Sequence, residues 1–305
     1  MRKECPCHHS DYFYHAFAFG LAAKTERPAN RTITTKATTT LASTGGHSFD
    51  RVEDFRMDGP VSFRAAHVEV GGSYDECHQA HTSFASAVVE GLNIHDVITA
   101  DKIVSRLSIK YPGEGSDPTE PSITPTGSYF ENLRIAGHKI DISLNTALFH
   151  THDTYSGLDN CYASSNELEP WLHWGKIETL NPSELEKLEN RHHSIMGMCE
   201  RFKEWKTKSG KKAGKASKGQ PHIPKMFWCS LAGDLKLKDH VKGPCELTNF
   251  GSIICIPNFG VVHLAELVVE KRFRRLRMLR VEMGSPTGAT FDTTGAGGGG
   301  GTPYP

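Results

Sequence analysis

Alternating apolar and polar residues run through much of the chain in short segments separated by turn residues. Between residues 84 and 110 the alternation reverses around His95 and Asp96 and then resumes, which is typical of two antiparallel strands joined by a tight turn. Similar segments recur, with one interruption, across residues 47 to 283. This two-residue periodicity predicts an all-β fold, either an antiparallel sandwich or a flattened barrel.

Two further strand segments carry more specific predictions. Gly137 and His138 follow one apolar-polar run and precede another, and a glycine at the first central position predicts a type II′ hairpin turn there. The run from 261 to 269 is apolar in both phases, with His263 and Leu267 in the same phase. It therefore predicts a central strand that is covered on both faces.

The interruption is a segment with helical spacing. Asn181 is a capping residue, Pro182 suits the first helical position, and apolar residues then recur at helical intervals as far as Trp205. A lysine-rich stretch follows, without a large apolar residue before Ile223. Residues 181–225 therefore predict one long α-helix and a mobile basic loop inserted into the β domain.

The two ends of the chain lack the apolar residues that a core requires. Residues 25–46 are rich in threonine, and the end of the chain contains an unbroken run of five glycines at 297–301. We expect an N-terminal arm at 1–46 that is mostly disordered or extended, a β-sandwich domain at 47–283, and a glycine-rich tail at 284–305 that joins no core.

Bulk composition excludes some classes of partner and location. The 35 Lys and Arg balance the 35 Asp and Glu, so no overall field favours a polyanion. The 8 Cys include no C-x2-C pair, which argues against a zinc ribbon. No segment has the apolar length of a transmembrane helix, and Asp11 and His15 interrupt the only leader-like stretch. The sequence favours a cytoplasmic location over export.

Three stretches resemble a known family. They are HDVITADKIVSRL, TGSYFENLRIAGHKID and IPNFGVVHLAELVV, and their order and phrasing resemble the bacterial β-rich proteins of the choice-of-anchor P family. The resemblance covers residues 84–145 and 245–283 and implies a surface-displayed β protein without an assigned activity. Neither a leader nor an anchor segment accompanies it, and the helix with its lysine loop is an insertion relative to the family.

Two groups of residues are candidates for metal binding. His150 and His152 in LFHTHDTY project to one side if that segment is a strand, and two imidazoles so placed can begin a transition-metal site, with Asp153 nearby. Cys77, His78 and His81 form a second group, in a segment that reads as a turn. Neither group has a complete ligand set, and a transition metal is the only cofactor that the sequence suggests.

Other residues are candidates for binding a partner. Trp171 and Trp174 in EPWLHWGK either bind a partner or anchor the base of the insertion, and Lys211, Lys212 and Lys215 belong to the basic loop. The run KRFRRLRMLR has six cations in ten residues, which suits an acidic partner or the solvent face of a strand. Balanced net charge argues against specific nucleic-acid binding.

No nucleophile elbow, phosphate-binding loop or dinucleotide fingerprint occurs in the sequence. The favoured function is therefore a non-catalytic structural or protein-interaction module. Its partner is another protein or a second copy, and self-assembly through the two chain ends is one version of this hypothesis. The alternative is a metal-dependent enzyme with a site around His150 and His152.

Overall fold

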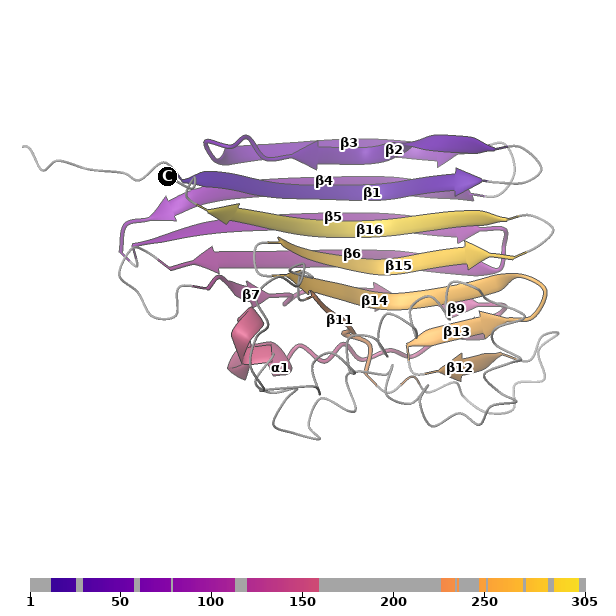
Figure 1. Cartoon of the computed structure of the whole chain (residues 1–305). Helices are drawn as coiled ribbons and strands as arrows, with labels where there is room; N and C mark the ends of the chain where they lie inside the picture. Colours follow the sequence, from indigo (N-terminus) through magenta and orange to yellow (C-terminus); the bar gives the residue numbers. More distant parts are fainter. Residues whose placement is uncertain are drawn as a thin grey trace, which may run out of the picture.

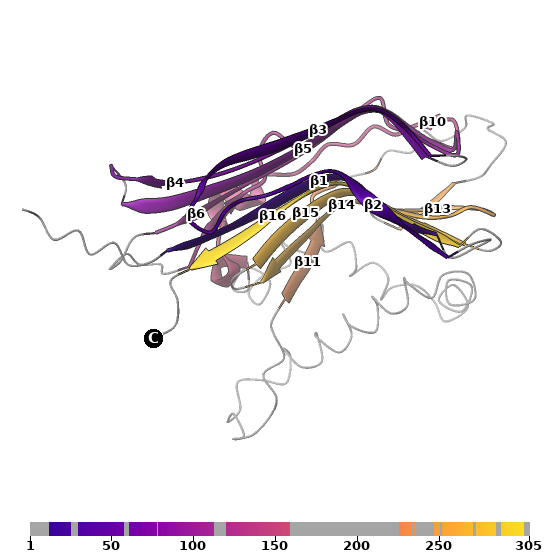
Figure 2. The ribbon, with the colours of Figure 1, turned by 90° about the horizontal axis from the view of Figure 1, so that it is seen from above.

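The computed structural model describes residues 12–25, 30–57, 61–77, 79–112, 120–158, 226–233, 235, 247–250, 252–270, 273–284 and 288–301. These residues form two antiparallel β-sheets stacked face to face (Figures 1 and 2). Neither sheet closes into a barrel in the described part of the chain, so the sandwich prediction is confirmed and the flattened-barrel version is not. No described helix is long and apolar enough to cross a membrane.

Sheet A contains the two ends of the chain and the strands that follow the insertion. Its strands, in spatial order, are β12 (Thr248–Phe250), β13 (Ile253–Ile256), β14 (Gly260–Glu270), β15 (Phe273–Met283), β16 (Ala289–Gly301), β1 (Phe13–Thr25) and β2 (Arg31–Thr40). A further strand, β11 (Met226–Ser230), pairs with the second half of β14. Hence β14 is paired along both edges, as predicted for a central strand.

Sheet B is made of one long meander and several short strands. Its strands, in spatial order, are β10 (His138–Lys139), β9 (Arg134–Ile135), β6 (Ile98–Tyr111), β5 (Ala80–Ile94), β4 (Val61–Asp75) and β3 (Gly46–Arg56), with β7 (Ser122–Thr124) and β8 (Tyr129–Glu131) also paired to β6. The predicted reversal at His95 and Asp96 is confirmed, and both residues have positive φ. The second hairpin is confirmed too, but its turn residues are Ala136 and Gly137, both with positive φ, which makes a type I′ turn.

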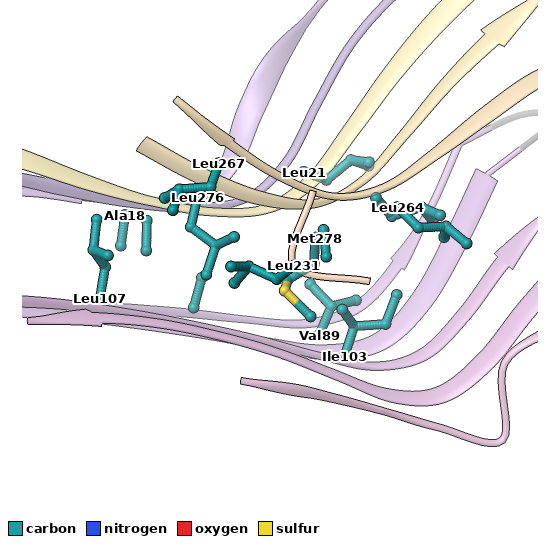
Figure 3. Close-up of a cluster of buried hydrophobic side chains, with 14 of the residues drawn as sticks. Ala18, Leu21, Val89, Ile103, Leu107, Leu231, Leu264, Leu267, Leu276 and Met278 are labelled. Carbon is teal, nitrogen blue, oxygen red and sulfur yellow. The ribbon is translucent and has the colours of Figure 1, made fainter. Parts of the chain in front are cut away.

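The side chains between the two sheets form one apolar core. Figure 3 shows leucine and valine side chains of both sheets meeting, with Leu264, Leu267 and Leu276 from sheet A facing Val89 and Ile103 from sheet B. Each fully buried side chain of this size stabilises the fold by about 1.5–3 kcal/mol relative to an exposed one. The core therefore lies between the two layers.

Both sheets bend along a line that crosses their strands, as Figure 2 shows. Positive φ marks this line on alternate strands: Ala265, Thr294 and Ala37 in sheet A, and Asp54 and Gly91 in sheet B. A residue in this conformation changes the direction of the strand and interrupts its two-residue alternation.

The interruption changes which residues of β14 share a face. Leu264 and Leu267 both lie in the core between the sheets (Figure 3), while His263 contacts Glu266, three residues along. The prediction that His263 and Leu267 share a face is therefore wrong.

The predicted ends of the domain are also wrong. Residues 13–25 and 31–40 are strands of sheet A, and the glycine-rich segment is β16, which pairs with β15 on one side and β1 on the other. Glycine can occupy a central strand here because the rings of Phe17 and Phe19 lie where side chains on Gly297 and Gly295 would be. The threonines of β2 suit an edge strand, since threonine favours extended backbone and tolerates exposure.

The predicted helix and basic loop at 181–225 lie outside the described residues.

Candidate functional site

The structure does not gather the histidines that the sequence suggested as metal ligands. His150 lies in α1 (Leu148–Thr151), a single helical turn, and His152 follows it. The premise that both point to one side of a strand is therefore wrong, because the segment is not extended. Among the described residues there is no group of three or more His, Cys, Asp and Glu side chains that could hold a metal ion.

The other candidate residues are placed as follows. Cys77 lies in an exposed turn, as predicted. His81 instead belongs to β5, and its Nδ1 atom and the Tyr14 hydroxyl share a hydrogen bond of 2.8 Å. The predicted partner-binding residues, Trp171, Trp174, Lys211, Lys212 and Lys215, lie outside the described residues, as does His78.

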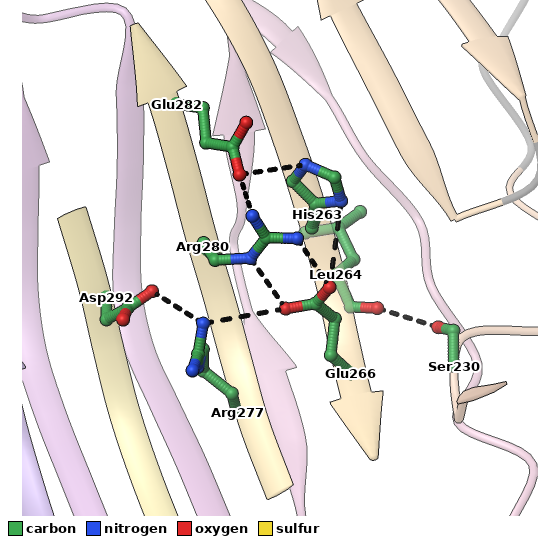
Figure 4. Close-up of polar contacts among 8 residues, drawn as sticks. All are labelled: Ser230, His263, Leu264, Glu266, Arg277, Arg280, Glu282 and Asp292. Atoms are coloured by element: carbon green, nitrogen blue, oxygen red, sulfur yellow. Dashed lines mark hydrogen bonds and ion pairs between the residues drawn. The ribbon is translucent and has the colours of Figure 1, made fainter. Parts of the chain in front are cut away.

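A buried ionic cluster on sheet A is the most concentrated group of charges in the described part of the chain (Figure 4). The Arg280 guanidinium donates two hydrogen bonds to the Glu266 carboxylate, from Nε to Oε2 at 2.8 Å and from Nη2 to Oε1 at 2.7 Å. Arg277 lies 3.1 Å from Asp292, and Arg280 also contacts Glu282. The cluster is on the face of sheet A that points away from the leucine core.

His263 and the neighbouring strand β11 complete this region. The His263 ring lies between the two glutamates, with Nδ1 3.7 Å from Glu266 Oε1 and Nε2 3.9 Å from Glu282 Oε1. The Ser230 hydroxyl donates a hydrogen bond of 2.7 Å to the carbonyl of Leu264. These contacts hold β11, β14 and β15 together at the bend.

The electrostatics of the cluster keep Glu266 ionised. Burial by itself would raise the pKa of Glu266, but the hydrogen bonds from Arg280 and the charges of His263, Arg280 and Arg277 lower the pKa to about 2. For Asp292 the effect of burial is larger than that of the nearby arginines, so its pKa is raised. A carboxylate with a pKa of about 2 is a poor general base near neutral pH, so Glu266 is suited to holding strands together.

A second cluster of rings lies where the ends of β1, β5 and β6 meet. The Tyr12 ring stacks on His81 with centroids 3.8 Å apart, and Tyr111 meets Tyr12 edge-on at 5.4 Å. Burial raises the pKa of Tyr111 to about 12 and lowers that of the fully buried Arg274, whose charge Tyr111 helps to stabilise. These phenols remain protonated near neutral pH, which does not suit them to proton transfer.

The outer face of sheet B differs from both clusters because it carries aromatic rings that are exposed. Phe49 on β3 is 74% exposed and Phe84 on β5 is 37% exposed. The registers place His47, Gly71 and Phe84 directly opposite one another on β3, β4 and β5, so they share this face. The His47 Nε2 atom lies 2.7 Å from Oε1 of Glu69, which is also on this face.

Sequence reasoning missed both the ionic cluster and this exposed face, although each left a signal. Glu266 stands within an otherwise apolar strand, where a buried charge requires a partner, and the next strand supplies Arg277 and Arg280. Two arginines of KRFRRLRMLR, Arg277 and Arg280, thus pair with carboxylates of sheet A. Phe84 occurs in the same phase as Ser86 and Glu90, opposite to the buried alanines of β5.

Taken together, the fold and these surfaces define an antiparallel β-sandwich with a charged cluster inside sheet A and an open aromatic face on sheet B. The chain belongs to the DUF8256 family, a domain of unknown function, whose model matches residues 12–270. It matches no curated protein and no solved structure. The residues matched by the family model include all of sheet B and end before β15 and β16. The resemblance to the choice-of-anchor P family stays a prediction.

Proposed function

We propose that this chain is a non-catalytic binding module, and that its contact surface is the outer face of sheet B. The observation that carries the proposal is the exposure of Phe49 and Phe84 on one face of a regular sheet. Large exposed aromatic side chains that lie together commonly mark binding surfaces, and strands hold them more rigidly than loops do.

The charged groups inside the fold support a non-catalytic role. The carboxylate of Glu266 is held ionised by two arginines, and the phenol of Tyr111 has a raised pKa, so neither group is matched to proton transfer near neutral pH. Both sets of contacts link strands, which is a structural use.

One version of the interaction hypothesis loses its premise. Self-assembly through a free N-terminal arm and a free glycine-rich tail requires segments that are available to a second copy. The strands β1, β2 and β16 instead pair with one another inside sheet A. The proposal therefore rests on the sheet B face and not on the chain ends.

The test is whether the exposed rings are dispensable for folding. We expect the double variant Phe49→Ser, Phe84→Ser to lower the free energy of unfolding in urea by no more than about 1 kcal/mol, since only the contact of the Phe84 ring with Gly71 is lost. A loss of more than about 2 kcal/mol would show that the rings belong to the folded core, as large-to-small core substitutions do, and would contradict the proposal.

The metal-enzyme alternative has a separate test. Elemental analysis of the purified protein, with and without replacement of His150 and His152 by glutamine, measures any bound transition metal. A stoichiometric metal that is lost in the double variant would overturn the non-catalytic proposal.

A further inference from the structure

The Phe84 side chain lies over the backbone of the neighbouring strand β4. A Cβ atom at Gly71 would overlap the Phe84 ring, so the ring occupies the space above this glycine. The ring nevertheless remains 37% exposed on the outer face of the sheet. Glycine at position 71 therefore allows the aromatic ring to lie close to the sheet.

This ring is the centre of a row that crosses five strands. His47, Gly71, Phe84, Ser108 and Thr124 are paired in sequence from β3 to β7. At the usual spacing of about 4.8 Å between strands, the row is about 19 Å long. It is a long and flat strip, which suits an extended ligand better than a compact one.

Short polar side chains surround the ring. Ser108 lies directly opposite Phe84 on β6, and Ser86, in the next outward-facing position of β5, is paired with Glu69. The hydrogen-bonded His47 and Glu69 lie beside the ring, with the His47 and Phe84 ring centroids 6.4 Å apart. We call His47, Phe49, Glu69, Phe84, Ser86 and Ser108 the Phe84 platform.

Both signs of charge occur near the platform, where Ser86 has the exposed Arg106 opposite it on β6 and Glu69 opposite it on β4. Arg51 pairs with Glu53, and Glu90 pairs with both Arg64 and Lys102. Because neither sign predominates, this face has no field that would attract a polyanion or a polycation. The exposed rings of this face, Phe49, Phe84 and Tyr129, are separated by polar groups, and such scattered apolar area is little for a stable protein interface.

We propose that the Phe84 platform binds a neutral polysaccharide chain. The proposal rests on the proposed function above and names its ligand class. A pyranose ring has one face of C–H groups, which carry slight positive charge and pack on the negative face of an aromatic ring. Its hydroxyls at the edge meet the carboxylate of Glu69, the His47 imidazole and the serine hydroxyls, and bonds to the carboxylate are the strongest of these.

The experiment is calorimetric titration of the full chain with neutral hexasaccharides, namely cello-, laminari-, malto-, manno- and chitohexaose. We expect at least one of them to bind. Phe84→Ala weakens that binding at least tenfold, and Gly71→Val does the same because it displaces the ring without removing it. Phe84→Trp retains binding. Phe13→Ala removes an exposed aromatic residue of sheet A and is the matched control, with unchanged affinity.

Several results would overturn the inference. The first is that none of the five hexasaccharides binds, and the second is that Phe84→Ala leaves binding unchanged. Equal or tighter binding of an acidic oligosaccharide, such as hexagalacturonate, contradicts a neutral ligand. A concentration-dependent dimer that Phe84→Ala abolishes in sedimentation velocity would make the platform an interface with a second copy.

The inference and the proposed function fail in different ways. If Phe84→Ala folds with unchanged stability but no hexasaccharide binds, only the ligand class is wrong. If the exposed rings prove necessary for folding, the proposed function fails as well.

Discussion

Replacing Glu266 with glutamine removes the charge at the centre of the ionic cluster and leaves the buried Arg280 without the carboxylate that accepts its two hydrogen bonds. Breaking a buried pair by removing one partner costs about 3–5 kcal/mol, because the remaining charge loses its compensation. The pKa of Glu266 gives an independent magnitude. A change from 4.5 to about 2 on folding corresponds to about 3 kcal/mol, at 1.36 kcal/mol per pKa unit. We expect Glu266→Gln to lower the free energy of unfolding by about 3 kcal/mol.

The same variant has a predicted dependence on pH. Because the pKa of Glu266 is depressed in the folded chain, its contribution is fully present above pH 4.5 and is lost as the pH falls from 4.5 towards 2. The natural chain therefore loses stability over this range, and Glu266→Gln loses about 3 kcal/mol less of it. Urea denaturation followed by circular dichroism at a series of pH values measures both quantities.

Two control variants separate the cluster from charge in general. Glu53→Gln removes one partner of an exposed pair with Arg51, which costs at most about 1 kcal/mol. Replacing the buried pair with apolar residues, as Glu266→Met with Arg280→Leu, recovers most of the stability. Arg277 keeps its pair with Asp292, and Glu282, which loses Arg280, is partly exposed to water. A loss of less than about 1 kcal/mol in Glu266→Gln, or an unchanged acid slope, would refute this account of the cluster.

Three other predictions concern the fold around these sites. We expect Gly260→Ala to lower the free energy of unfolding in urea by more than about 2 kcal/mol, because Gly260 has a φ of 155° and a Cβ there would overlap the carbonyl oxygen of Glu282. A loss below about 0.5 kcal/mol contradicts this prediction. Leu276→Ala costs about 2–5 kcal/mol by the same measurement, since the side chain is fully buried between the sheets, whereas the exposed Phe13→Ala costs less than about 0.5 kcal/mol. We expect Tyr111 to ionise only near pH 12 in a phenolate absorbance titration of the folded chain, with Tyr111→Phe as the control. Its contribution to stability is then complete below pH 10 and is lost as the pH rises towards 12. Ionisation of Tyr111 near pH 10 in the folded chain contradicts its burial.

The strands of sheet B could be predicted because their side chains alternate regularly and their turns are short. The alternation in β5 and β6 fixes which residues face the core, and the buried residues Ile103, Leu107 and Ile109 all lie in one phase of it. The bend could not be predicted in the same way. Ala265 has positive φ although alanine has no preference for that region, so only the surrounding sheet determines its conformation. Every face assignment beyond that residue in β14 is shifted.

The roles of the chain ends could not be predicted from the local sequence either. A run of glycines has no hydrophobic pattern, and its burial in β16 depends on rings from β1, which is more than 270 residues away in sequence. The ionic cluster also depends on distant residues, since Asp292 reaches Arg277 only through the pairing of β15 with β16. In both cases the information lies in tertiary contacts and not in the segment itself.

The chain places aromatic rings over glycines in both sheets, and comparing the two supports a binding role for Phe84. In sheet A, Phe17 and Phe19 lie over Gly297 and Gly295, and Phe17 also stacks on Phe273 with ring centroids 5.9 Å apart. There the rings replace missing side chains and pack against other groups, so stability accounts for them. Phe84 covers Gly71 in the same way, but it remains 37% exposed, with polar residues beside it in the sheet. Covering a glycine does not require that exposure. Binding to another molecule is therefore the better explanation for a partly exposed Phe84 ring among the polar residues of the platform.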